Sequence, residues 1–244
     1  MAKKPLVSVV IPAYNEGKYL EKCLKGIFGQ SRPNFDLEVI VANDWRSTDQ
    51  TGEIAKKLGA TEIIVKKPTP AYARQEGVEK ARGEIIACVD ADTLLPKNHL
   101  ANIVSEFAKD PNLVGVTGFM DGWGGSFWER FSYKWSNILL WSLTFALGKR
   151  GFQGQSFAFR KSAFLKIGGF NTSIYTGEDV DLGCRMSKVG KVKLLKKIVG
   201  ISSTRRMRKD PLSKAVSRGF LTYLKYIWDL NLTKKDKEPF ANVG

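Results

Sequence analysis

The chain has 244 residues, of which 43% are hydrophobic and 26% charged, a composition that allows a sizeable core and excludes a disordered or fibrous protein. Its three cysteines are odd in number and far apart, and no CxxC pair occurs. This pattern argues against a disulfide framework or a zinc knuckle and predicts a reducing compartment. The run at residues 5–11 meets polar residues too soon for a signal peptide, so a cytoplasmic location is expected.

The formal charge of +15 is concentrated near the carboxyl terminus. Residues 185–237 contain 16 Lys and Arg but only 3 Asp and Glu. A segment of this kind could bind nucleic acid, an anionic membrane surface or the phosphates of a substrate. Lysines also serve simply to solvate a surface, so charge alone does not choose among these partners.

The amino-terminal half alternates apolar runs with helical patterns. The expected strands are 6–11, 38–42, 61–66 and 84–90, and the expected helices are 19–28, 49–58 and 71–81. Pro12 is expected to end the first strand. The alternation predicts an open α/β sheet in which the polar loops after strands one, two and four meet at one edge. The sequence has no GxGxxG and no Walker loop, so neither a dinucleotide fold nor a P-loop is predicted.

The fourth of these runs ends in two aspartates, Asp90 and Asp92, one residue apart. Ligands of parallel sheets bind at the carboxyl ends of the strands. Two carboxylates at this spacing can converge on Mg2+ or Mn2+, with substrate phosphates completing the coordination. The pattern therefore predicts a metal and nucleotide site, although a solvated turn after a strand would carry the same residues.

The second half is less regular. Helices are expected at 97–110, 162–167 and 178–189 and strands at 113–119 and 156–160, with His99 at the surface or at a helix start. Trp128, Phe131 and Trp135 recur at helical spacing in a stretch rich in aromatic residues, and the apolar run at 138–147 is too short to span a bilayer. The stretch fits an interfacial helix or a hydrophobic acceptor wall, but an ordinary core helix laid on the sheet fits it slightly better.

Two charged clusters follow. Glu178, Asp179 and Asp181 crowd one first helical turn, where the macrodipole favours acids but three carboxylates repel each other, which suggests proton acceptance or a charged contact. Further on, Arg205, Arg206 and Arg208 suit phosphate recognition, or simply begin a solvated helix. An amphipathic helix is expected at 211–230, with apolar residues Phe220, Tyr223, Leu224, Ile227 and Trp228.

Together these stretches resemble the family 2 inverting glycosyltransferases. The matching stretches are Val7–Glu16, Ser47–Asp49, Ala73–Arg74 with Gly77, Ala81–Ile86, Asp90–Asp92, Ala158–Arg160, Gly168–Phe170 and Gly177–Leu182 with Arg185. The resemblance implies a GT-A fold, which is a Rossmann-like, mixed and mostly parallel α/β sheet flanked by helices. It also implies a catalytic domain at 1–209, with a nucleotide half to residue 95 and an acceptor half from 96, and a basic amphipathic helical tail at 210–244.

The resemblance also implies roles for the matching residues. The nucleotide would be bound by Pro12, Ala13, Tyr14, Glu16, Asp44, Arg74 and Asp90. Asp92, with Asp90, would bind the Mn2+ or Mg2+ that bridges the diphosphate of a nucleoside-diphosphate sugar. Asp179 would be the catalytic base with Glu178 beside it, and Arg205, Arg206 and Arg208 would close on the diphosphate.

One stretch departs from the family pattern, which has two aspartates and a glycine before Ser-Thr-Asp. Counting from the strand places Asn43 and Asp44 in the paired positions, whereas counting back from Asp49 places Asp44 and Trp45 there. Because Asp44 satisfies both registers, it is the residue expected to recognise uracil or guanine, with UDP favoured over GDP.

The predicted function is a metal-assisted, single-displacement transfer of a hexosyl group to a hydroxyl or lipid-linked acceptor. An anionic surface at the cytoplasmic face of a membrane is a candidate partner. A non-enzymatic basic binder of nucleic acid or membrane is the first alternative, but it leaves the acidic clusters without a purpose, so nucleic acid is not the expected partner. A sugar nucleotidyltransferase is the second alternative. It would carry a glycine-rich basic loop after the first strand, which is absent.

Overall fold

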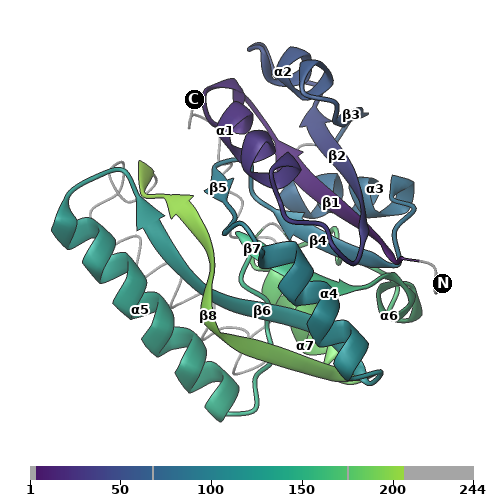
Figure 1. The fold of residues 1–244 in the computed structure, drawn as a ribbon, viewed down its shortest axis with the longest axis vertical. Coiled ribbons are helices and arrows are strands. Elements are labelled where there is room, and N and C mark those ends of the chain that lie inside the picture. Colours follow the sequence, from purple (N-terminus) through teal and green to yellow (C-terminus); the bar gives the residue numbers. More distant parts are fainter. Residues whose placement is uncertain (1–3, 68, 175, 206–244) are drawn as a thin grey trace.

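A computed structural model describes residues 4–67, 69–174 and 176–205, and within them eight strands form one sheet (Figure 1). The strands are β1 Leu6–Ala13, β2 Asp36–Asp44, β3 Thr61–Val65, β4 Ile85–Val89, β5 Thr93–Leu94, β6 Leu113–Trp123, β7 Ser156–Arg160 and β8 Lys191–Ser203. The helices are α1 Gly17–Phe28, α2 Thr51–Lys57, α3 Pro70–Lys80, α4 His99–Lys109, α5 Phe127–Ala146, α6 Lys161–Lys166 and α7 Glu178–Met186.

The strand order is β3-β2-β1-β4-β7-β6-β8-β5. The first four strands in this order are parallel, whereas β7 runs antiparallel to both β4 and β6. The alternating amino-terminal half therefore forms a parallel sheet with helical crossovers, as its sequence predicts, and the less regular second half adds the antiparallel strand.

Helices cover both faces of the sheet because the strands are apolar on both sides. On β1, Val9 and Ile11 belong to a core that includes residues of α1, α2 and α4. Val10 points the other way, into a core that includes residues of α3, α5, α6 and α7. This alternation is the two-residue period of a strand, and its fully apolar form is typical of a parallel strand buried on both faces.

Three details differ from expectation. β1 does not end before Pro12 but continues to Ala13, because beyond Val10 it pairs only with β2, where a residue without an N–H group is tolerated. Neither β8 nor the short strand β5 was anticipated. His99 does begin α4, but it is buried rather than at the surface, and its Nε2 lies 3.3 Å from Ser156 Oγ.

The aromatic stretch forms the single long helix α5, which packs on β6 (Figure 1). Trp141, Thr144 and Phe145 are buried beneath it, as expected of a core helix, while other large apolar side chains of α5 are exposed. The helices of the described residues include none with the length and apolarity needed to cross a membrane. The expected helix at 211–230 lies outside the described residues.

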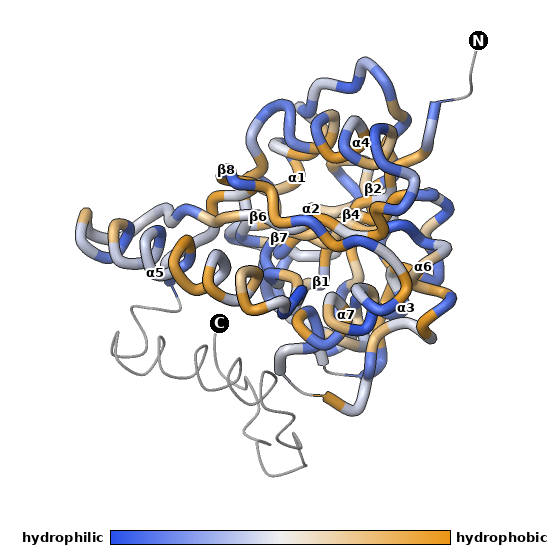
Figure 2. Tube along the Cα trace, turned by 90° about the horizontal axis from the view of Figure 1, so that it is seen from below, coloured by the Kyte–Doolittle hydropathy of each residue, from blue (hydrophilic) through white to orange (hydrophobic). Residues whose placement is uncertain are grey.

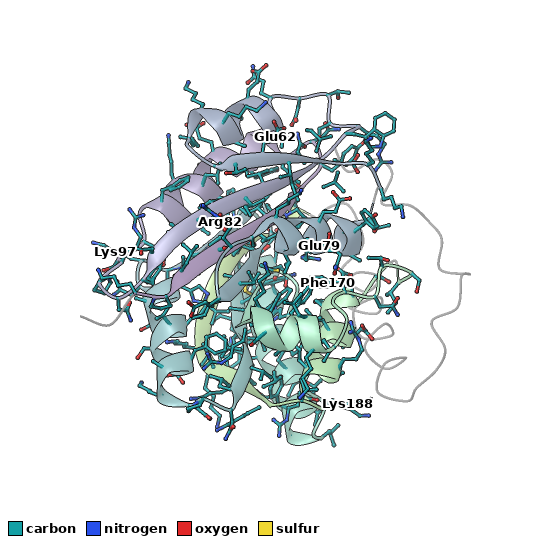
Figure 3. All side chains as sticks on the ribbon, turned by 90° about the vertical axis from the view of Figure 1, so that its right-hand side faces the viewer. Glu62, Glu79, Arg82, Lys97, Phe170 and Lys188 are labelled. Atoms are coloured by element: carbon teal, nitrogen blue, oxygen red, sulfur yellow. The ribbon has the colours of Figure 1, made fainter. Side chains whose placement is uncertain are left out.

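The helix α3 packs closely against β1. A Cβ atom added to Gly77 would lie 2.3 Å from Cγ1 of Val10, so only glycine lets α3 approach β1 this closely. On the other side of α3, the side chain of Gln75 accepts a hydrogen bond of 2.9 Å from the backbone N–H of Phe170. Figure 3 shows Phe170 just below α3, next to Glu79 in its last turn.

We expect Gly77→Ala to lower the free energy of unfolding, because overpacking costs about 1–3 kcal/mol and outweighs the roughly 1 kcal/mol gained in helix propensity. Gly26→Ala in α1 is the matched control, since a Cβ atom there meets nothing within 4 Å. It should be neutral or stabilising by up to about 1 kcal/mol. Urea unfolding of both variants tests this, and equal effects would contradict the packing argument.

Candidate active site

The carboxyl ends of β2, β1 and β4 lie side by side and present their loops at one edge of the sheet. β1 is the central strand of the three, and Ala13 at its end pairs with Asn43 of β2. Asp90 directly follows β4, and Asp92 lies between β4 and β5. The polar residues that the sequence places after strands one, two and four therefore share one edge, which is the ligand side of an α/β sheet.

A buried guanidinium crosses this edge. Arg74 of α3 is 3% exposed, and its Nη2 donates to Asp90 Oδ1 at 2.7 Å and to the Gly154 carbonyl at 3.2 Å. Its Nη1 donates to Glu178 of α7. Burial opposes the charge of Arg74, but Asp90 and Glu178 outweigh this and raise its pKa. Arg74 was expected beside the nucleotide, and the structure places it between the two acidic stretches.

Asp179 lies next to this network at the start of α7. Burial, reinforced by the neighbouring charge of Glu178, raises its pKa to about 7, although the charge of Arg74 acts against the shift. A Cβ atom at position 154 would lie 2.8 Å from Asp179 Oδ2, so Gly154 leaves the space that this carboxylate fills. A carboxylate with a pKa near neutrality suits proton transfer at physiological pH.

A second arginine, Arg205, pairs with the carboxylates of Glu16 and Asp92. Arg205 pairs through Nη2 with Glu16, its Nε lies 3.1 Å from Asp92 Oδ2, and its guanidinium stacks 4.4 Å from the centroid of the Tyr19 ring. The hydroxyl Oγ of Ser202 also lies near Asp92, 3.5 Å from its Oδ1. The structure thus brings Arg205, Glu16 and Asp92 together. Arg206 and Arg208 lie outside the described residues.

The three candidate residues of the loop after β2 have different surroundings. Asp44 is buried, accepts from Nε and Nη2 of Arg46 at 2.9 and 2.8 Å, and has a lowered pKa because these interactions outweigh its burial. The Arg46 guanidinium also lies 5.0 Å from the Tyr14 ring. Asn43 instead donates to Glu62 at 2.8 Å, while Trp45 is 61% exposed. Of the three candidates, Asp44 is the one that binds the arginine lying over Tyr14.

The side chains at this edge would supply only some of the ligands of a divalent cation. Among the described residues, no group of three or more His, Cys, Asp and Glu side chains could hold a metal ion. Asp92, already paired with a cationic group, has the hard oxygen donors that Mg2+ and Mn2+ prefer, and such ions commonly take one or two protein carboxylates plus substrate phosphates. The donor set therefore fits a cation shared with a phosphate-bearing ligand.

Sequence reasoning missed three contributors to the site. Arg46 could have been suspected from its position two residues after Asp44, a spacing at which a turn brings side chains together. Gly154 gave no signal, because a close approach is visible only once α7 is placed. Ser202 was missed together with β8.

Two solved structures share this architecture. The mannosyltransferase PcManGT from Pyrobaculum calidifontis, in complex with GDP-Man and Mn2+, has a TM-score of 0.63 and 24% identity, over 82% of this chain and 57% of that one. TarS 1–349 from S. aureus, in complex with UDP-GlcNAc, has a TM-score of 0.64 and 20% identity, over 82% of this chain and 58% of that one. The fold is that of the GT-A glycosyltransferases, which confirms the predicted fold class.

Sequence comparison gives the family. The model of glycosyl transferase family 2 matches residues 8–168. The chondroitin synthase of Pasteurella multocida strain Pm70 is 34% identical over 201 residues, which are 80% of this chain but 20% of the synthase. The chain thus spans about a fifth of that relative's length. It belongs to glycosyl transferase family 2, as its motifs predict.

The pKa of Asp179 makes stability depend on pH. Because the folded protein retains a proton that the unfolded chain releases near its ordinary pKa of 3.8, the free energy of unfolding falls as pH rises from about 4 to about 7, by up to about 1.4 kcal/mol per pH unit. We expect Asp179→Asn to remove this slope and Asp181→Asn, in the same helix, to retain it. Urea unfolding across this pH range tests the difference, and an unchanged slope in Asp179→Asn would rule out the raised pKa.

Proposed function

We propose that this chain transfers a hexosyl group from a nucleoside-diphosphate sugar to a hydroxyl or lipid-linked acceptor, with inversion in a single displacement. One observation carries the proposal. Arg74 joins Asp90, on the loop that would hold the donor, to Glu178, the neighbour of the proposed base Asp179. This link supports the proposal, because a donor phosphate site at Asp90 and a proton acceptor at Asp179 would then lie at one sheet edge, as an in-line displacement requires.

The proposed donor subsite combines Pro12, Ala13, Tyr14, Glu16, Asp44, Arg74 and Asp90 with the cation ligand Asp92. We favour a uridine donor over a guanosine donor, with Asp44 accepting from an N–H group of the base. The neighbours give support for both, since TarS is complexed with UDP-GlcNAc and PcManGT with GDP-Man and Mn2+. A bound Mn2+ or Mg2+ would neutralise charge that develops on the leaving diphosphate.

Protein residues would provide the remaining chemistry. Asp179 accepts the proton of the acceptor hydroxyl on the face opposite the leaving group, and its pKa of about 7 places it close to the working pH. Arg205, with Arg206 and Arg208, would turn from Glu16 and Asp92 to the diphosphate and stabilise it more in the transition state than in the ground state. The location proposed for this reaction is the cytoplasm or the cytoplasmic face of a membrane.

Calorimetric titration tests the donor subsite. We expect the wild-type protein to bind UDP or a UDP-sugar in the presence of Mn2+ or Mg2+, more tightly than GDP, and Asp92→Asn to lose the metal-dependent part of the affinity, because neutralising the carboxylate removes a charged ligand. Asp36→Asn, at the opposite end of β2, is the matched control and should bind as the wild type does. The proposal fails if no nucleotide binds with either metal.

Turnover tests the base. With a hydroxyl acceptor, Asp179→Asn should lower kcat by about 10²–10⁴ while leaving donor affinity unchanged, since it removes only proton acceptance. Asp181→Asn is the control in the same helical turn. Full activity of Asp179→Asn would contradict the assigned role, and would point to an acceptor, such as a phosphate, that is already ionised.

A further inference from the structure

The exposed side of α5 carries a continuous line of large apolar side chains. We define the α5 apolar row as Phe127, Phe131, Trp135, Leu139, Leu143 and Leu147, which are between 45% and 71% exposed. Residues four apart on a helix are neighbours on its surface, so the row runs along all of α5, about 30 Å at 1.5 Å per residue. Figure 2 shows α5 at one side of the molecule, with hydrophobic residues recurring along it.

The α5 apolar row is not explained by folding. The side chains that attach α5 to the body are others, chiefly Trp141 and Phe145, which are 6% and 7% exposed. Within the row, the rings of Phe127 and Phe131 and those of Phe131 and Trp135 have their centroids 6.0 Å apart, so they form one unbroken aromatic surface. A contiguous exposed apolar surface of this kind marks an interaction site.

The polar residues of α5 indicate what it contacts. The exposed ones are Arg130, Ser136 and Ser142, and none carries a negative charge. The single acid of α5, Glu129, is partly buried and accepts a hydrogen bond of 2.6 Å from the backbone of Ser126 in a capping box. Aromatic and leucine side chains beside a basic and hydroxyl-bearing flank are the composition of helices that lie in the headgroup region of a lipid bilayer.

The described chain ends near the aromatic end of the row, and the sequence that follows is basic. Thr204 Oγ1 donates to the Gly124 carbonyl at 2.5 Å, directly before α5, and the described residues end at Arg205. The 39 residues that follow contain 9 Lys and Arg and 4 Asp and Glu. A basic segment that starts beside exposed Phe and Trp side chains complements an anionic lipid surface, and it repels a second copy of a chain with net charge +15.

We propose that the α5 apolar row docks this protein on an anionic lipid surface. Docking would bring the site close to the bilayer, because Trp123, four residues before the row begins, donates from Nε1 to the Asp92 carbonyl at 3.1 Å. This last consequence rests on the proposed function and, within it, favours the lipid-linked acceptor. The docking itself does not depend on any transfer activity.

Vesicle binding by the full chain tests the proposal. We expect co-flotation with vesicles of phosphatidylglycerol and phosphatidylcholine but not with phosphatidylcholine alone. Phe131→Ser with Trp135→Ser should weaken binding at least about tenfold, since two large apolar side chains leave the interface. The matched control is Ile64→Ser with Leu165→Ser, which are 53% and 64% exposed on β3 and α6. UDP calorimetry of all variants should be unchanged, which separates this test from that of the donor site.

A fluorescent label on Leu139→Cys, in a Cys184→Ala background because the other two cysteines are buried, identifies what covers the row. Docking predicts a label that aqueous iodide quenches freely, and that becomes protected and blue-shifted when phosphatidylglycerol vesicles are added. Protection of the label without vesicles would overturn the proposal. If it occurred at all protein concentrations, residues 206–244 would be the occupant of the row, and if it occurred only at high concentration, the occupant would be a second copy of the chain. Flotation that is unaffected by Phe131→Ser with Trp135→Ser would overturn it too.

Discussion

The site depends on one buried positive charge. The guanidinium of Arg74 lies between Asp90, after β4, and Glu178, at the start of α7, and it also holds the Gly154 carbonyl before β7. A buried charge needs opposite charges and hydrogen bonds close by, and removing one partner of such a group typically costs about 3–5 kcal/mol. The three segments are therefore held in one arrangement. Gly77 makes this possible, because it lets α3 carry Arg74 deep enough into the fold.

The carboxylates at this edge of the sheet are chemically alike but have different surroundings. Asp44, bound by Arg46, has a lowered pKa and is suited to remain ionised, whereas Asp92 is paired with the positive charge of Arg205. Asp179 has a raised pKa because burial and the charge of Glu178 outweigh Arg74. Carboxyl groups whose environments separate their pKa values take different roles in a reaction. In the proposed reaction these roles would be donor binding on one side and proton acceptance on the other.

The sequence was sufficient for the features that local pattern determines. Apolar runs and helical spacing predicted the alternating half, and Asp90 and Asp92 were located by the end of their strand. What depended on contacts between distant segments was missed or misassigned. Arg74 was recognised as a site residue, but its contact with Glu178 was not anticipated, since the two lie 104 positions apart. The strand β8 has lysines on exposed positions that hide its buried residues, and His99 is covered by a strand far along the chain. The roles of the individual site residues stay predictions.

Arg205 gives Asp92 and Glu16 an internal counterion. A cation that bound at Asp92 would compete with this tethered one, which never leaves the molecule, so the affinity for a free ion would be the intrinsic affinity diminished by this exchange. A diphosphate offers Arg205 a new anionic partner, and the exchange becomes favourable when both ligands arrive together. Metal and nucleotide binding would then be positively linked, each tightening the other by the same factor. Between one substrate and the next, Arg205 would return to Glu16 and Asp92, so these two carboxylates would always have a compensating positive charge nearby.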